Sequence, residues 1–258
     1  MGGVKRKVIG GISIGIQKTP EFLVEKIEKF LAEGYQRIKI KIRPGEDLEY
    51  IKEVRKAFDD IPLSCDANSS YKLEDLARLR EIDQYGLSMI EQPLGYDDIV
   101  DHATLQKQLK TRICLDESIN SLDDARRAIS LGSCRVINIK VSRVGGLTEA
   151  RRIQALAKSK GIPVWCGSTF EIGIGSGHNI AVATLPGYTE PNDIFSTADF
   201  FDENNRVTAP VMVEPDGTLQ VSDEIGTGFE PIPKELEGHT LQKWDFMNDC
   251  LNFAQFWK

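Results

Sequence analysis

Short apolar runs alternate with helix-like segments along most of the chain. This alternation predicts parallel strands joined by helices, and eight such units favour a closed α/β barrel of the TIM type. The strand-like runs are GGISIGI (10–16), RIKIKI (37–42), LSCDAN (63–68), SMIEQP (88–93), RICLDES (112–118), VINIKVS (136–142), VWCGS (164–168) and DIFST (193–197).

Helix signals fall between these runs. Thr19 and Pro20 predict a helix start, and apolar residues then repeat on one face until Gly34. Ser121 followed by Asp124 has the spacing of a capping box, and the same helix is expected to end at residue 132. Further helices are expected at about 48–58, 73–82, 98–109, 147–160 and 177–184.

After about residue 207 the pattern changes to short strand-like pieces and a tail rich in proline and glycine. We expect one barrel domain over residues 1–258, with an irregular C-terminal extension from about residue 207. The alternative fold is an open doubly wound sheet. It is disfavoured because no GxGxxG motif follows a strand and because the charged strand residues spread over five strands.

Five ionisable residues stand near the ends of successive strand-like runs: Lys41, Asp66, Glu91, Asp116 and Lys140. Their intervals are 25, 25, 25 and 24 residues. A strand, a helix and two loops need about this length, so each interval is interpreted as one βα unit. Parallel barrel strands end on the same face, where barrel enzymes build their sites. We therefore expect these five side chains to converge.

The period-two alternation of strands predicts which side chains face the barrel interior. In RIKIKI the isoleucines share the outer face, which turns the two lysines inward. The same rule selects as inward-facing Lys39, Lys41, Asp66, Asn68, Asn138 and Lys140. Unpaired ions inside a barrel are costly, so charges of both signs there need a shared purpose.

The three acids supply carboxylates from successive strands, which are ligands that Mg²⁺ prefers, with Mn²⁺ as an alternative. No histidine is among the candidates, which disfavours zinc. Lys41 and Lys140 flank the acids, so a substrate carboxylate at the metal would lie between two amines. Proton abstraction alpha to that carboxylate builds an enediolate, which a cation stabilises, and a lysine can act as the base. Each residue alone is better interpreted as a salt-bridge partner, but five with matching spacing, parity and charge favour catalysis.

The composition of the chain limits the kinds of molecule that it is expected to bind. The formal net charge is −7, and 41% of the 258 residues are hydrophobic. These values argue against nucleic acid or an anionic membrane and fit a single large core. No apolar stretch is long enough for a membrane span or a signal peptide, so we expect a cytoplasmic protein with a small carboxylate as ligand. A homo-oligomer is left open.

The cysteines and histidines give no metal-binding pattern. No CxxC spacing occurs among the five cysteines, which are expected to be reduced and buried: Cys65, Cys114, Cys134, Cys166 and Cys250. His102 and His239 lie in polar surroundings and are expected at the surface.

Several stretches jointly resemble one enzyme family: KIKIRPGEDLEYIKEVR, CDANSSY, IEQPL, LDESI, NIKVSRVGGLTEARRI and FEIGIGSGHNIA. They are similar to the enolase superfamily, in its muconate-lactonizing-like subgroup, and most of all to the o-succinylbenzoate synthase/N-succinylamino acid racemase family. The resemblance covers most of positions 10–190 and implies a modified (β/α)7β barrel. It also implies Lys41 and Lys140 as the acid/base pair and Asp66, Glu91 and Asp116 as Mg²⁺ ligands, in keeping with the superfamily's general use of a lysine or histidine base with Mg²⁺.

The reaction that the resemblance implies is dehydration of a succinyl-hydroxycyclohexadiene carboxylate to o-succinylbenzoate, a step in menaquinone synthesis. Lys41 would remove the proton, while Lys140 as a cation would face the enediolate. Racemisation of N-succinylamino acids by the same lysines is one alternative, and a catalytically silent barrel is another.

Two departures from the family pattern bear on the substrate. Members carry an N-terminal capping domain, whereas this chain begins almost at the first barrel strand, so the cap is expected to be absent. Ser168 and Thr169 stand where the family more often has Gly-Met. Together with Lys39 and Asn68, they are the candidate substrate-binding residues.

Overall fold

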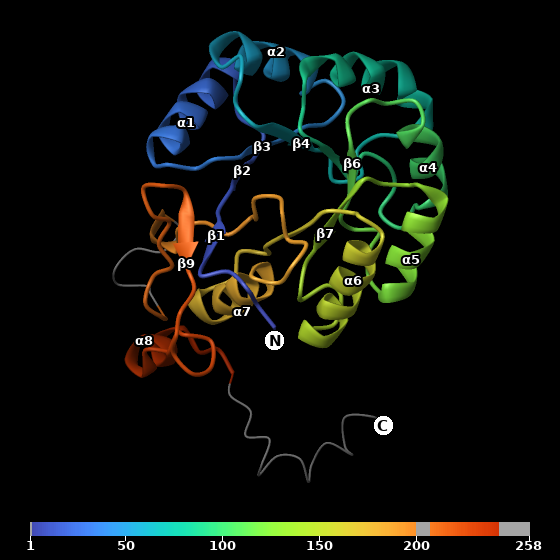
Figure 1. The fold of residues 1–258 in the computed structure, drawn as a ribbon. Coiled ribbons are helices and arrows are strands. Elements are labelled where there is room, and N and C mark those ends of the chain that lie inside the picture. The colour runs from blue at the N-terminus through green and yellow to red at the C-terminus, as the bar shows by residue number, and fades with distance from the viewer. Residues whose placement is uncertain (1, 200–206, 243–258) are drawn as a thin grey trace.

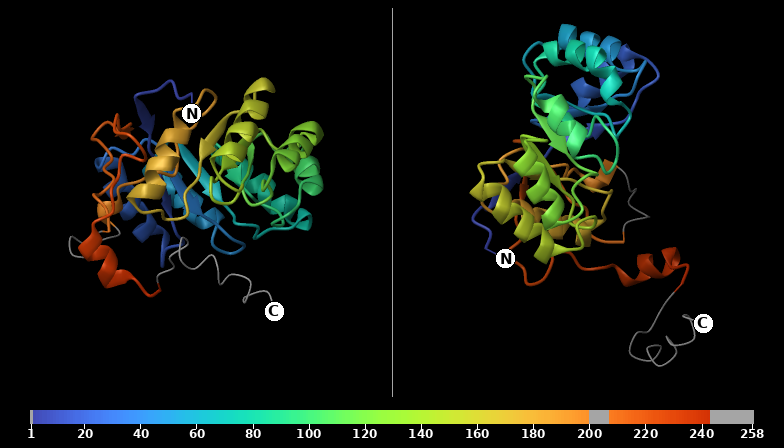
Figure 2. Two further views of the ribbon diagram at one scale, coloured as in Figure 1. Left: turned by 90° about the horizontal axis from the view of Figure 1, so that it is seen from below. Right: turned by 90° about the vertical axis from the view of Figure 1, so that its right-hand side faces the viewer.

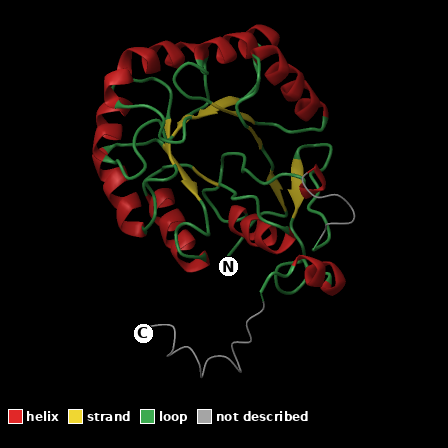
Figure 3. Ribbon diagram, turned by 180° about the vertical axis from the view of Figure 1, so that it is seen from behind, coloured by secondary structure: helices red, strands yellow, loops and turns green. Residues whose placement is uncertain are grey.

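Seven parallel strands form the centre of the molecule, and connecting helices lie around them (Figures 1 and 3). The structure is a computed structural model that describes residues 2–199 and 207–242. The strands follow chain order in one sheet: β2 (Ile12–Ile14), β3 (Ile38–Lys41), β4 (Leu63–Asp66), β5 (Ile90–Glu91), β6 (Ile113–Leu115), β7 (Val136–Ile139) and β8 (Val164–Cys166). The fold is therefore of the TIM type, as the alternation predicts.

The helices begin close to where the capping signals place them. Their bounds are α1 (Pro20–Ala32), α2 (Leu48–Ala57), α3 (Leu76–Ile82), α4 (Val100–Gln106), α5 (Leu122–Leu131), α6 (Leu147–Ser159), α7 (Gly173–Ala183) and α8 (Pro233–His239). The Thr19 hydroxyl accepts a hydrogen bond from the backbone N–H of Phe22, and the Ser121 hydroxyl accepts one from Asp124. Both predicted starts are confirmed. α4 is shorter than predicted, and α7 begins at Gly173, before the predicted residue 177.

The predicted eighth strand over 193–197 is wrong, because these residues form no strand. The segment just before them instead joins β8 to the start of the chain. Tyr188 pairs with Val164 and Asn192 pairs with Gly10, each as an isolated parallel bridge. Pro191 lies between these two bridges and has no N–H to donate to a ladder.

The strands present two chemically different faces. Isoleucines such as Ile38 and Ile40 belong to the main core beneath the helices. On the inner face Met89, Cys114 and Trp165 form a separate cluster with Val136. This arrangement places an apolar layer inside the barrel.

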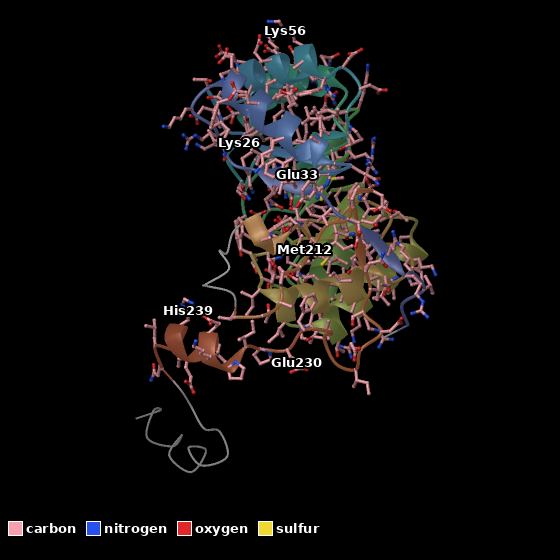
Figure 4. All side chains as sticks on the ribbon, turned by 90° about the vertical axis from the view of Figure 1, so that its left-hand side faces the viewer. Lys26, Glu33, Lys56, Met212, Glu230 and His239 are labelled. Carbon is pink, nitrogen blue, oxygen red and sulfur yellow. The ribbon has the colours of Figure 1, made fainter. Side chains whose placement is uncertain are left out.

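The C-terminal extension folds back on the start of the chain. Strand β9 (Thr218–Gln220) pairs antiparallel with β1 (Lys7–Ile9), and the extension also packs against α7. A Cβ on Gly177 would lie 2.3 Å from the carbonyl oxygen of Thr227, which explains the glycine there. Helix α8 has no buried residue and stands off the barrel, with His239 near its end (Figures 2 and 4).

Of the predictions about the cysteines and histidines, most are confirmed and one is wrong. Cys65, Cys114, Cys134 and Cys166 are buried and free, whereas Cys250 lies outside the described residues. His239 is exposed as predicted, but the prediction for His102 is wrong because its side chain is fully buried. The ring Nε2 of His102 accepts a hydrogen bond from the backbone of Leu94, so this histidine fixes the loop after β5. Within residues 2–199 and 207–242, no helix combines the length and apolar character that a membrane crossing needs.

Candidate active site at the carboxyl ends of the strands

The five ionisable residues selected by their spacing lie at one end of the barrel. Lys41, Asp66 and Glu91 are the last residues of β3, β4 and β5, while Asp116 and Lys140 directly follow β6 and β7. The three acids are almost completely buried, whereas the side chains of Lys41 and Lys140 are 30% and 19% exposed. The carboxylates thus form the floor of the site, and the two amines lie nearer its opening.

Each of these lysines contacts a different acid. Lys41 Nζ lies 2.6 Å from Asp66 Oδ2, and Lys140 Nζ lies 2.8 Å from Asp116 Oδ2. Glu91 lies on the strand between these acids and accepts a hydrogen bond of 2.8 Å from Asn138 Nδ2. The predicted convergence of the five residues is therefore present in the structure.

The strand register staggers this set. Lys41 is opposite Asp66, and Asp66 is opposite Glu91, but Glu91 is opposite Cys114. Asp116 therefore stands two residues farther along its strand than even spacing alone would indicate. Strands of a closed sheet must be staggered in this way, because they tilt relative to the barrel axis.

Lys39 lies on β3, two residues before Lys41, in a wholly buried charge cluster. Its Nζ is 2.6 Å from Asp193 Oδ2, 2.8 Å from Glu91 Oε2 and 3.2 Å from Asp66 Oδ2. The ring of Trp165 closes another side, with its centroid 4.8 Å from the ammonium nitrogen. Arg37 pairs with the second oxygen of Asp193.

The pKa shifts follow from burial and crowding. Burial and the charge of Asp66 raise the pKa of Glu91 to about 8. Burial alone would lower the pKa of Lys39, but Asp193, Glu91 and Asp66 together raise it well above its usual value. Burial is likewise outweighed at Lys140, whose pKa is raised mainly by Asp116. Lys39 and Lys140 are therefore held as cations in the metal-free protein.

Unusual backbone conformations collect at the same end of the strands. Asn68, Ser69, Gln92 and Phe170 have φ values of 41°, 64°, 36° and 61°, in the left-handed region that favours glycine. All four follow strands β4, β5 or β8 within a few residues. At Gln92 the unusual backbone conformation accompanies a contact within the site. The side-chain Oε1 of Gln92 accepts a hydrogen bond of 3.0 Å from the backbone N–H of Asp116 and so positions that acid.

The acids fit a hard divalent cation by their donor chemistry, because three buried carboxylates come from adjacent strands. Their crowding, which raises the pKa of Glu91, is what such a cation would relieve. Among the described residues, no three histidine, cysteine, aspartate or glutamate side chains are arranged as a preformed metal-ligand cluster. Lysine and arginine side chains instead contact the oxygens of Asp66, Glu91 and Asp116.

The candidate substrate-binding residues lie at this end but already have partners. Asn68 accepts a hydrogen bond from Lys41 Nζ at 2.5 Å and donates one to Glu117 Oε1 at 2.9 Å. The hydroxyls of Ser168 and Thr169 both donate to Glu171. Their role in binding substrate stays a prediction, as does that of Lys39.

Sequence reasoning missed several side chains that organise the site. Asp193 was treated only as the start of a strand, and Arg143 was not singled out although it pairs with Asp116 Oδ1. Gly167 was also missed. A Cβ there would lie 2.3 Å from Asn138 Oδ1, so glycine leaves room for the amide that binds Glu91.

The fold and the site together define a class of α/β barrel protein with a ring of acids and lysines at the carboxyl ends of its strands. Residues 23–235 match the profile of the family described as Enolase C-terminal domain-like, and the chain belongs to this family. The predicted resemblance and the predicted fold class are both confirmed.

Named relatives agree with this assignment. The chain is 50% identical over 240 residues to the o-succinylbenzoate synthase of Geobacillus kaustophilus, which covers 93% of this chain and 64% of that protein. It is 46% identical over 228 residues to the N-succinylamino acid racemase of Thermus thermophilus, covering 88% and 61%. A crystal structure of an enolase superfamily member from Listeria innocua superposes with a TM-score of 0.88 at 43% identity, covering 93% and 64%. The chain thus spans less than two thirds of the length of these relatives.

Proposed function

We propose that this protein catalyses Mg²⁺-dependent proton abstraction alpha to a carboxylate, through an enediolate intermediate. The observation that carries the proposal is the pairing of two lysines, one at the end of β3 and one directly after β7, with acids of one buried cluster. Lys41 contacts Asp66, Lys140 contacts Asp116, and Glu91 lies on the strand between these acids. Amines on both sides of a carboxylate-lined floor can act on the two faces of one carbon atom.

The two lysines have different parts in this reaction. We assign proton removal to Lys41, whose partial exposure lets it reach a bound substrate. We assign the cationic role to Lys140, because Asp116 keeps its pKa raised and so keeps it protonated beside a developing negative charge. Lys39 cannot be the base in its present place, since Asp193 and Asp66 lie 2.6 and 3.2 Å from its ammonium nitrogen and hold it as a cation.

Asp66, Glu91 and Asp116 would hold the metal ion. When bound, Mg²⁺ supplies a fixed positive charge that stabilises the enediolate oxygens. Asn138 and Gln92 orient Glu91 and Asp116 for this task through their hydrogen bonds. The residues around the acids therefore orient these carboxylates and bury them away from water.

The reaction we favour is dehydration to o-succinylbenzoate, because relatives at 50% and 54% identity carry the name o-succinylbenzoate synthase. The test is Mg²⁺-dependent formation of the aromatic product, followed by its ultraviolet absorbance. Lys41→Ala and Lys140→Ala should each lower kcat by about 10³-fold or more, as loss of a positioned acid or base does. Lys56→Ala, at an exposed lysine of α2, is the matched control. Turnover that survives both site substitutions would refute the assignment.

A second candidate is racemisation of N-succinylamino acids. It is favoured by the placement of Lys41 and Lys140 on different sides of the acids, and by the name of the Thermus thermophilus relative. In deuterium oxide, a racemase should introduce deuterium at the alpha carbon starting from either enantiomer. Retention of the alpha proton in both enantiomers would remove this candidate. A protein that binds Mg²⁺ and turns over neither substrate would support the catalytically silent barrel.

A further inference from the structure

Lys39 occupies the position of a counter-ion among acids that the proposed metal also needs. Its ammonium group contacts Glu91 and Asp66, two of the three candidate ligands, at 2.8 and 3.2 Å. Its side chain is only 3% exposed, so it cannot turn to water if those oxygens bind a metal. A cation entering the site therefore competes with Lys39 for the oxygens of Glu91 and Asp66, and the displaced ammonium group cannot be solvated by water.

Asp193 offers that lysine a separate partner. Its Oδ2 lies 2.6 Å from Lys39 Nζ, the shortest of the three carboxylate contacts. Asp193 does not belong to the candidate metal ligands, because it comes from the segment that follows β8. There its backbone N–H donates to Cys166 O at 2.9 Å. Arg37 pairs with Asp193 Oδ1 and fixes the carboxylate from the other side.

We propose that Asp193 is a positioning residue that holds Lys39 when the metal takes Glu91 and Asp66, and that it thereby sets the metal affinity of the site. This inference rests on the proposed function, since it assumes that those acids bind a divalent cation. Without Asp193, Glu91 and Asp66 would be the remaining carboxylates in contact with Lys39. The ammonium would then resist giving them up, and a buried ammonium without a partner is strongly disfavoured.

The alternative is that Asp193 acts only as one more negative charge near the metal. A double-mutant cycle separates the two explanations, because the first acts through Lys39 and the second does not. In the Lys39→Met background Asp193 keeps its partner Arg37, so the carboxylate stays paired. Methionine is close to lysine in length and removes the competing charge.

The experiment measures Mn²⁺ affinity by the electron paramagnetic resonance signal of the free ion. We expect D193N to weaken Mn²⁺ binding by about tenfold or more and K39M to strengthen it. K39M/D193N should match K39M within about twofold, which is the scatter of independent sites. An equal loss from D193N in both backgrounds would overturn the inference.

Two controls keep the outcome clear. D83N makes the same change at a buried aspartate before β5, where the carboxylate accepts hydrogen bonds from Lys110 and Thr111, and it should leave Mn²⁺ affinity unchanged. If D193N does not fold, the comparison of K39M with K39M/D193N decides, and a gap of more than about fivefold refutes the inference. Absence of saturable Mn²⁺ binding to the unsubstituted protein would instead refute the proposed function.

Discussion

At Glu91 the stability of the metal-free fold and the proposed binding of a metal make opposite demands on one carboxyl group. Burial and the charge of Asp66 raise its pKa from 4.5 to about 8, so the folded metal-free protein keeps a proton that the unfolded chain releases. Where the folded state binds more protons, the free energy of unfolding falls as pH rises. For Glu91 this window runs from about pH 4.5 to about pH 8, and above it the folded protein carries a buried ionised acid close to Asp66 and Asp116.

Glu91→Gln tests this conflict directly. With a chelator present, the substitution should raise the free energy of unfolding relative to the unsubstituted protein by more at pH 8.5 than at pH 5.5. Added Mg²⁺ should stabilise the unsubstituted protein and leave E91Q unchanged, because binding to the folded state alone is what stabilises. Urea unfolding followed by circular dichroism measures both effects. Glu237→Gln on the exposed helix α8 is the control, and a pH-independent difference for E91Q would contradict the argument.

At the scale of single residues, the sequence identifies site residues that recur at a regular spacing. It does not identify site residues that follow no such spacing. The five spaced ionisable residues were found because each lies at or directly after the end of a strand, at intervals of 24 or 25 residues. Asp193 follows no such interval, and its importance comes from Lys39 and Arg37, which are distant in sequence. His102 was misplaced because the polar residues beside it in the sequence do not show that its ring is buried and accepts a hydrogen bond from the Leu94 amide.

At the scale of elements, Asp47 ties helix α2 to its neighbour. Its carboxylate accepts hydrogen bonds from the Leu48 N–H at the helix start, from the Tyr71 hydroxyl at 2.7 Å and from Arg78 Nε at 3.1 Å. Burial alone would raise the pKa of Asp47, but these bonds lower it. A carboxyl with a lowered pKa stabilises the fold above its unfolded pKa, and this contribution is lost as pH falls through its folded value.

Asp47→Asn should therefore destabilise the protein at pH 7 by about 2 kcal/mol, the usual value for a buried hydrogen bond to a charged group. The loss should shrink as pH falls below about 4, because the unfolded chain then binds a proton at Asp47 that the folded protein, with its lowered pKa, binds only at lower pH. Thermal unfolding at pH 7 and at pH 3.5 measures the difference. Asp60→Asn, at an exposed position beyond α2, should change stability by less than about 0.5 kcal/mol. A loss for D47N that stays the same at both pH values would contradict the prediction.

Strand and helix positions follow from the sequence where local signals dominate, and fail where distant contacts decide. Capping residues such as Thr19 and Ser121 act within their own turn, so both starts were predicted. Helix α7 was placed too late because its glycines resemble a loop. Gly173 and Gly177 are helical because they pack against Thr208, Phe229 and Thr227 of the C-terminal extension, which periodicity within α7 cannot indicate.

For the whole molecule, the connection between β8 and the start of the chain depends on the side chain of Asn192. Its Oδ1 accepts the backbone N–H of Cys166 at 2.8 Å, and its Nδ2 donates to Ile9 O at 3.0 Å. One amide therefore links both sides of the gap where no regular strand forms. The side chain thus replaces part of a missing ladder, which explains how a segment containing proline can bridge the two ends of the sheet.

Asn192→Ala should open this connection without removing any charged group of the site. It leaves the Cys166 N–H buried without its partner, so the free energy of unfolding should fall by about 2 kcal/mol. Amide hydrogen exchange should rise first at Cys166 and Val164, because local opening of the connection exposes β8 before the rest of the sheet. Asn120→Ala, at an exposed asparagine, is the matched control. If exchange instead rose uniformly over all seven strands, the barrel would open as one unit and Asn192 would not be the point at which its ends are joined.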